Sequence, residues 1–377
     1  MTASCAVGEM SYTALTSRMS DRIVAGRIPV EGTLELTYRC NLACVQCYCN
    51  LPAGDEEARR KELTTPEVYR ILDGIAEAGC LWLLLTGGEI LLRKDFLEIY
   101  AYAKRKGFLL TLFTNGAGIT ARIADALASE PPFAIEITLY GASEGTYRRV
   151  TGRSGQYARV LAGIERILER RLPLALKSTI VEQNEPDLPA MREFAHARGL
   201  SFRYSAELHP RTDDPGGVVG DRLTPEAALE LDRADPERWE ELRKLFTVED
   251  RSRLSNRSPS LFICYAGVSG FHINPYGRLQ FCPSIEALGH DLRKVPFAEA
   301  WRRFAAFRRL QAPPVRACNE CDLNVACGSC AGEAHLDSGD MTRGTEFHHR
   351  LTSLRADAFG LRLTENEKGA LKIDAGT

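Results

Sequence analysis

The sequence has no large excess of charge and no long apolar run. Its 48 Lys and Arg residues face 50 Asp and Glu residues, so the net charge at pH 7 is −2. This balance argues against bulk electrostatic attraction to nucleic acid or to an anionic membrane. No segment reaches the roughly 18 apolar residues of a membrane span, and Met1 to Val24 lacks the features of a secretion signal. We therefore expect a cytoplasmic protein.

Internal repeats and low-complexity tracts are also missing. The hydrophobic share of 44% and the charged share of 26% are ordinary for a globular protein, which excludes long disorder, collagen-like and coiled-coil chains. A chain of 377 residues exceeds what one hydrophobic core usually organises. Two or more domains are expected.

Cysteine, in contrast, is abundant. The chain has 12 Cys, and in a reducing cytoplasm clustered Cys indicate metal ligands or redox groups rather than disulfides. Only Cys5, Cys49 and Cys80 fall outside two groups. The groups are Cys40, Cys44 and Cys47 near the front, and Cys264, Cys282, Cys318, Cys321, Cys327 and Cys330 near the back.

Short apolar runs alternate with helical patterns over the first half of the chain, which is typical of repeated βα units. The expected strands are Thr33–Thr37, Leu81–Leu85, Leu109–Phe113, Phe133–Leu139, Leu174–Val181 and Ser201–Ala206. The helices expected between them lie near Thr65–Ala78, Lys94–Lys106, Ala121–Ser129, Tyr157–Arg170 and Leu188–Arg198. The pattern predicts a parallel sheet with outer helices, either open or closed into part of a barrel.

The pattern changes after His209. A stretch rich in Pro, Gly and Asp leads into a charged helical region from Thr224 to about Phe246, as expected of a connection between domains. From Phe262 the chain is Cys-rich, with a short amphipathic helix over Phe297–Leu310.

The spacing Cys40-x3-Cys44-x2-Cys47 follows the first predicted strand. Three thiolates on one loop can bind an iron–sulfur cube and leave its fourth iron open to a ligand. A zinc site completed by a distant residue, or chance clustering, is the alternative.

Gly87-Gly88-Glu89 follows the second strand, at the ligand-binding end of a parallel α/β fold. Glycine there lets the backbone approach a ligand closely. A plain turn explains the pair equally well, and the G-x-G-x-x-G nucleotide pattern is absent.

Taken together, the Cys triplet, the Gly-Gly-Glu turn, Thr114-Asn115-Gly116 and the segment Thr138–Gly141 resemble the radical S-adenosylmethionine (SAM) enzymes over about residues 32–207. The resemblance implies a partial (β/α)6 TIM-like barrel. It implies a 4Fe–4S cluster on Cys40, Cys44 and Cys47 that chelates SAM. Further cofactor contacts implied in this way come from Gly87, Gly88, Glu89, Thr138 and Lys177. Ile90 departs from the family, which usually has Pro at this position.

The activity implied by the resemblance is reductive cleavage of SAM to a 5'-deoxyadenosyl radical, which abstracts hydrogen from a substrate. It requires a reducing electron donor such as flavodoxin or ferredoxin. We expect apolar strands to line the barrel interior and to exclude water from this chemistry.

The C-terminal pattern Cys264-x12-Gly277-x4-Cys282, followed after a gap by Cys318-x2-Cys321-x5-Cys327-x2-Cys330, would by itself suit a zinc ribbon. After a radical SAM domain it resembles the SPASM extension, which carries one or two auxiliary 4Fe–4S clusters. By this resemblance Cys318, Cys321 and Cys327 bind the distal cluster, and Cys264, Cys282 and Cys330 bind the nearer one. The domains expected are an N-terminal extension (1–30), the barrel (31–208), a helical linker (209–260), the SPASM domain (261–360) and a tail (361–377).

Two departures from the SPASM pattern concern its end. The last spacing is x2 instead of x3, and no Cys follows Cys330 as a seventh ligand. His348 and His349 lie where that ligand is expected, and we predict that His349 binds the distal cluster, since imidazole can replace thiolate. Two ordinary surface histidines are the alternative.

Three functions remain open from the sequence. The first is maturation of a ribosomally made peptide by cross-linking or side-chain oxidation, the role most often found among SPASM relatives. The second is dehydrogenation or decarboxylation of a carbohydrate-like or tetrapyrrole metabolite. The third is a zinc-stabilised binding module without catalysis. Residues 1–30 are too short for a leader-peptide-binding domain.

Overall fold

The computed structural model describes residues 12–217, 219–248, 254–255, 258–313, 317–367 and 369–374. Residues 1–11 of the expected N-terminal extension, Cys5 among them, and 375–377 of the expected tail lie outside the described residues. Within the described residues, no helix is long and apolar enough to cross a bilayer.

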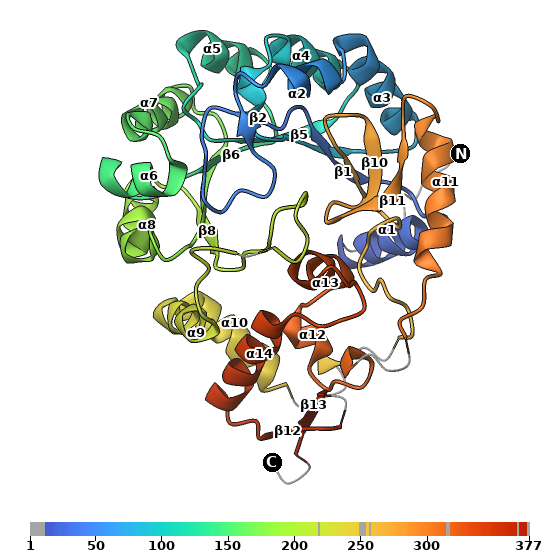
Figure 1. Cartoon of the computed structure of the whole chain (residues 1–377). Helices are drawn as coiled ribbons and strands as arrows, with labels where there is room; N and C mark the ends of the chain where they lie inside the picture. Colours follow the sequence, from blue (N-terminus) through green and yellow to red (C-terminus); the bar gives the residue numbers. More distant parts are fainter. Residues whose placement is uncertain are drawn as a thin grey trace, which may run out of the picture.

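Six parallel strands form the front half of the protein (Figure 1). They pair in chain order with parallel register, for example Leu34 beside Leu85 and Thr138 beside Lys177. The strands are β1 (Glu31–Glu35), β4 (Trp82–Thr86), β5 (Leu109–Thr114), β6 (Ala134–Thr138), β7 (Leu174–Thr179) and β8 (Phe202–Ser205). The predicted α/β fold with a partial barrel of six βα units is confirmed.

Helices cover the outer face of this sheet (Figure 1). Several begin with the capping residues that their sequences carry, such as Thr64 and Glu67, which cap α3 reciprocally. The helices are α2 (Glu56–Lys61), α3 (Thr65–Glu77), α4 (Phe96–Arg105), α5 (Ala121–Ser129), α6 (Glu144–Thr151), α7 (Gln156–Glu169) and α8 (Leu188–His196), with two short 3-10 turns, η1 (Ile90–Leu92) and η2 (Glu185–Asp187).

The two faces of the barrel strands differ in polarity. Side chains toward the helices are apolar and buried, such as Leu83 and Leu85 of β4. The alternate positions face the barrel interior and include Glu35, Thr86 and Lys177. Leu84 and Phe113 face the interior as well, so apolar strand residues do line the cavity, as expected, with these polar groups between them.

The Cys-rich C-terminal half continues the same sheet. Strand β9 (Gly270–Ile273) pairs parallel with β1, and β10 (Arg278–Cys282) and β11 (Ile285–Asp291) add antiparallel strands, giving nine in all. Helix α11 (Phe297–Arg308) covers this extension and packs on α3. Helix α1 (Tyr12–Gly26) lies nearby, where Trp301 Nε1 donates to the Arg27 carbonyl at 2.7 Å.

The remaining C-terminal elements gather beside the barrel, with α13 between the two parts (Figure 1). The charged helical region predicted from Thr224 to about Phe246 holds two helices, α9 (Pro225–Ala234) and α10 (Pro236–Phe246), because Pro236 starts a new helix that Asp235 caps. The other elements are η4 (Ala317–Asn319), α12 (Asn324–Cys327), α13 (Ala331–Ser338), α14 (Glu346–Ala358) and the hairpin β12 (Leu363–Glu365) and β13 (Leu371–Ile373), with a short pair β2 (Arg39–Cys40) and β3 (Leu51–Pro52) beside the barrel.

Candidate active site

A cavity of about 540 Å³ opens at the carboxyl ends of the barrel strands. Pockets of this size hold small-molecule ligands in other proteins. Its walls come from β1, β4, β5, β6 and β7, and Pro283, Ser284 and Leu336 of the C-terminal half close one side. The predicted site residues that line it are Cys40, Cys44, Cys47, Gly87, Gly88, Thr138 and Lys177.

The loop that carries Cys40, Cys44 and Cys47 is fixed at both ends. Short strands β2 and β3 close it, and the Ala43 and Val45 N–H groups donate to the last carbonyls of α6 at 2.8 and 3.0 Å. This holds the loop against the cavity.

The three thiols lie close enough to one another to interact electrostatically. Burial raises the pKa of Cys40 to about 12 and also raises the pKa of Cys44. Three converging thiols, two of which are hard to ionise without a cation, fit an iron–sulfur cluster, because bound metal deprotonates its thiol ligands.

Cys49 is a fourth thiol in this loop, which sequence reasoning set aside. A hydrogen bond from the Cys49 thiol lowers the pKa of Cys47 to about 7. Cys49 itself is buried, and the pKa of its thiol is raised well above the ordinary value by that hydrogen bond and by burial. Its position two residues after Cys47 was the available signal.

Gly87 and Gly88 are required by contact with the cysteine loop. Gly87 has a φ of +139°, and a Cβ there would lie 2.2 Å from the Thr37 carbonyl oxygen. A Cβ on Gly88 would lie 2.5 Å from the Tyr38 and Arg39 carbonyl oxygens. The Gly88 N–H donates to the Thr37 carbonyl at 2.6 Å, and the Glu89 N–H to the Arg39 carbonyl at 2.9 Å. The turn therefore clamps the loop that leads into Cys40 and also borders the cavity.

The Glu89 carboxylate points into the protein rather than into the cavity. It is 1% exposed and accepts hydrogen bonds from the Thr114 hydroxyl at 2.8 Å, the Asn115 N–H at 2.8 Å and the Leu91 N–H at 3.0 Å. Burial raises its pKa, and these donors oppose the rise. Glu89 thus joins the turn after β4 to the turn after β5, and the carboxylate is fully engaged by protein groups.

Thr138 ends β6 and pairs with Lys177 of β7, and both residues face the cavity. The Lys177 ammonium lies 3.3 Å from Glu136, which also pairs with Arg203. Burial lowers the pKa of Lys177 to about 7, and Glu136 only partly offsets this. Lys177 therefore lines the cavity, and its carboxylate partner, Glu136, is shared with Arg203.

A Glu–His–Tyr group at the cavity wall, in which Glu35 is buried and Tyr48 exposed, was missed from the sequence. Glu35 accepts from the Tyr48 hydroxyl at 2.6 Å and lies 3.0 Å from His272 Nε2. The Glu35 side chain is 1% exposed. A lone Glu in an otherwise buried strand was the only signal, because His272 comes from β9, more than 200 residues later.

The C-terminal cysteines fall into the two predicted sets. Cys318, Cys321 and Cys327 interact electrostatically with one another, as Cys282 does with Cys264 and Cys330. The described cysteines are all free thiols. Burial raises the pKa of Cys330 to about 12.

His348 and His349 point to different faces of α14. His349 is half-exposed, and its Nε2 lies 3.2 Å from Glu365 of β12. His348 is buried and stacks on His209. The Thr352 hydroxyl, one turn after His348, donates to Cys327. For His349 to bind the distal cluster, as predicted, its side chain would have to leave Glu365.

Comparisons with known proteins agree with this architecture. Residues 34–195 match the radical SAM superfamily. The chain is 30% identical over 324 residues to the mycofactocin maturase MftC of Mycolicibacterium smegmatis, covering 82% of this chain and 76% of that protein. It is 26% identical over 328 residues to the AdoMet-dependent heme synthase of Methanosarcina barkeri, covering 81% of this chain and 92% of that protein.

Among solved structures, Streptococcus suis SuiB bound to its precursor peptide SuiA superposes with a TM-score of 0.65 at 14% identity, covering 92% of this chain and 83% of that one. At this identity the likeness shows the fold. The chain belongs to the radical SAM superfamily and is an enzyme. The cofactors of that family are SAM and a 4Fe–4S cluster.

Replacing Glu89 should destabilise the protein before it affects cofactor binding. In Glu89→Ala the Thr114 hydroxyl and Asn115 N–H lose their buried acceptor, which costs about 1–3 kcal/mol for each group. We expect a clear fall in Tm by circular dichroism, a smaller fall for Glu89→Gln, and almost none for Glu57→Ala, whose ion pair is exposed. An unchanged Tm with lost SAM affinity would instead show direct cofactor contact.

Replacing Lys177 should affect SAM affinity and thermal stability in ways that two separate measurements can distinguish. If its ammonium pairs with the SAM carboxylate, Lys177→Met weakens SAM binding by about tenfold in calorimetry. Because the folded pKa of about 7 lies below the ordinary 10.5, the unfolded chain binds the extra proton between these values and wild-type stability rises with pH. The Tm of Lys177→Met relative to wild type should therefore fall from pH 7 to pH 9. Exposed Lys106→Met should show no such fall, and unchanged SAM affinity in Lys177→Met would remove the assignment.

Proposed function

We propose that this enzyme is a peptide maturase of the radical SAM superfamily with a SPASM-type C-terminal region. In this proposal Cys40, Cys44 and Cys47 hold the cluster that binds SAM. Gly87, Gly88, Thr138 and Lys177 contact SAM from the cavity wall. The buried Glu89 carboxylate supports the Gly87-Gly88 turn, instead of making the cofactor contact that the sequence predicted for it.

The observation that carries this proposal is the convergence on one cavity of the Cys triplet, the Gly-Gly turn and two polar residues of neighbouring strands. These groups come from four of the first five βα units, which the parallel register brings to the same end of the sheet. A zinc-binding module without catalysis, the third function that the sequence left open, does not fit an enzyme of this superfamily.

When bound, the cluster and SAM supply one-electron chemistry that removes a hydrogen atom from the substrate. The chain's own groups position the substrate and handle protons. Glu35 orients His272 through Nε2, and both lie at the cavity wall with Tyr48. A carboxylate–imidazole pair at hydrogen-bond distance is suited to accept a proton from a substrate N–H, O–H or S–H group.

In this proposal each of the two predicted sets of C-terminal cysteines binds an auxiliary cluster. Two separate groups of three thiols fit two iron–sulfur clusters better than one tetrahedral zinc, which takes four ligands. The proposed SPASM domain begins near residue 261, although its first strands share the barrel's sheet. An external reductant such as flavodoxin or ferredoxin is the proposed electron source.

The proposed substrate is a ribosomally made peptide. MftC is named a maturase, and the SuiB structure contains a precursor peptide. A tetrapyrrole is the second candidate, since the heme synthase relative matches this chain over 92% of its own length. The two are separated by the substrate that the enzyme modifies.

The test is anaerobic reconstitution with SAM, dithionite and either a candidate precursor peptide or Fe-coproporphyrin, with mass spectrometry of the products. Replacing Cys40, Cys44 and Cys47 together by Ala should abolish formation of 5'-deoxyadenosine, while iron on the C-terminal cysteines remains. The matched control replaces Cys80, a buried Cys outside every set, by Ala. If the triple variant still forms 5'-deoxyadenosine, the assignment of the front cluster is wrong.

Replacing His272 should uncouple SAM cleavage from substrate modification. His272→Gln removes the proton acceptor while leaving the cysteine loop untouched, so we expect 5'-deoxyadenosine to form without a matching amount of modified substrate. Product formed in the wild-type ratio to 5'-deoxyadenosine would show that His272 has no part in proton transfer.

A further inference from the structure

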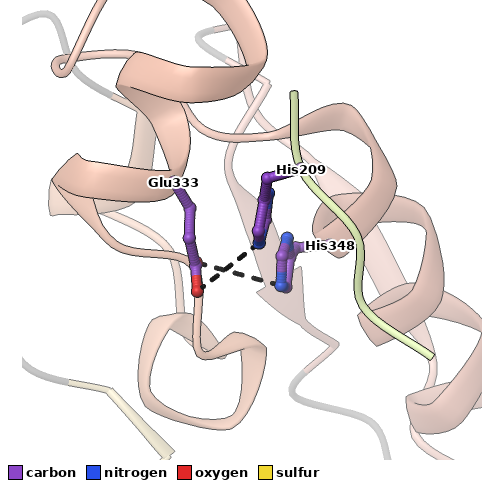
Figure 2. A group of neighbouring side chains, drawn as sticks. All are labelled: His209, Glu333 and His348. Atoms are coloured by element: carbon purple, nitrogen blue, oxygen red, sulfur yellow. Dashed lines mark ion pairs between the residues drawn. The ribbon is translucent and has the colours of Figure 1, made fainter. Parts of the chain in front are cut away.

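Two histidines and a glutamate meet between the barrel and the C-terminal helices (Figure 2). His209 lies in the segment after β8, Glu333 in the first turn of α13, and His348 in the first turn of α14. One nitrogen or oxygen atom from each lies within 4.8 Å of the other two. Three separate elements therefore bring metal-binding groups to one point.

Both imidazoles direct Nε2 toward the Glu333 carboxylate. His209 Nε2 lies 3.8 Å from one carboxylate oxygen and His348 Nε2 lies 3.9 Å from the other. The rings are parallel, with an interplanar angle of 7°. These distances are too long for hydrogen bonds, but they suit ligands placed around a shared cation, whose own bonds are about 2.0–2.2 Å long.

The other ring nitrogens are already held. His209 Nδ1 lies 3.0 Å from Asp337, and His348 Nδ1 lies 2.5 Å from the Thr345 hydroxyl. Metal-binding histidines typically have this arrangement, in which a carboxylate or hydroxyl fixes the ring and leaves the second nitrogen for the metal.

The site also brings two carboxylates, Glu207 and Glu333, to the histidines. Glu207 lies 3.8 Å from His348 Nε2, and among the described residues the side-chain ion pairs of Glu207 and Glu333 go only to these two histidines. Besides His348, Arg355 and Arg238, which share Asp232, lie close enough to Glu207 to lower its pKa, and Arg222 contacts Asp337. The His348 side chain is 3% exposed, whereas the Glu207 and Glu333 side chains are 38% and 24% exposed. Among the described residues Glu333 has no ion pair with an arginine or lysine, so its carboxylate can attract a cation to the point between the two imidazoles.

We propose that His209, Glu333 and His348 bind one divalent transition-metal ion, separate from the iron–sulfur clusters, with Glu207 beside it. Two imidazoles and a carboxylate suit Zn²⁺, Fe²⁺, Mn²⁺ or Co²⁺, whereas Mg²⁺ and Ca²⁺ prefer only oxygen ligands. Three protein ligands leave coordination positions open on the side where Glu207 and His209 line the cavity. The proposal does not depend on which substrate the enzyme modifies.

The experiment uses the full chain with its clusters reconstituted, desalted from EDTA and kept without SAM. Mn²⁺ is the probe, because thiolates bind it poorly and the six-line EPR signal of free Mn²⁺ disappears on binding. We expect one equivalent of Mn²⁺ to bind, and Zn²⁺ to displace it, since Zn²⁺ binds such ligands more tightly.

Four variants decide the assignment. His209→Ala, His348→Ala and Glu333→Gln should each weaken Mn²⁺ binding by about tenfold or more, with iron content and cluster EPR unchanged. In the wild-type protein the Cys330 N–H donates to Glu333 at 3.0 Å. Glu333→Gln keeps a side-chain oxygen that can accept this hydrogen bond. Glu365→Gln, a glutamate beside the half-exposed His349, is the matched control and should bind Mn²⁺ as wild type does.

Three results would overturn the proposal. One is wild-type protein that binds no Mn²⁺ and whose bound Zn²⁺, if any, is held by cysteines alone. Another is binding that all four variants retain. The third is loss of cluster iron in both His209→Ala and His348→Ala, which would make the histidines cluster ligands. Because no step uses SAM or substrate, none of these results bears on the proposed peptide chemistry.

Discussion

The backbone contact between the turn after β4 and the loop after β1 organises the site. Gly87 and Gly88 approach the carbonyls of residues 37–39 so closely that no side chain fits between them, and two hydrogen bonds join the segments. Glu89 then ties the same turn to Thr114 and Asn115, and the Asn115 amide donates to Cys40 at 3.7 Å. Three βα turns thus form one hydrogen-bonded unit around the first cysteine, and the positions of the other cavity groups are defined relative to it.

Much of the fold follows from the sequence because each βα unit carries its own signals. The apolar strand runs and capped helices place all six barrel strands within two residues of their bounds. The front cavity follows as well, since consecutive parallel strands must present their carboxyl ends together. The inner face was less predictable, because runs such as Trp82–Leu85 look uniformly apolar although alternate residues face the cavity.

Some groups of the site could not be predicted because their contacts join segments that lie far apart in the sequence. His272 reaches Glu35 only because β9 pairs with β1, and nothing in either segment indicates the other. His209, Glu333 and His348 belong to three regions that no shared motif connects. The split of the charged helix at Asp235–Pro236 was readable in principle. The environment of Glu89 was not, because the groups that bury its carboxylate, Thr114 and Asn115, lie in the turn after the next strand.

The addition of β9 to β1 means that the order of segments along the chain differs from their order in space. The first strand of the barrel is an interior strand of the whole sheet, with β4 on one side and β9 on the other. A fragment that ended before residue 270 would leave β1 with a row of unpaired backbone N–H and C=O groups, which invites pairing with other chains. The barrel and the first strands of the cysteine-rich half therefore share one hydrogen-bonded sheet. Recombining either half with that of a relative would succeed only where the new partner supplies a matching strand along this edge.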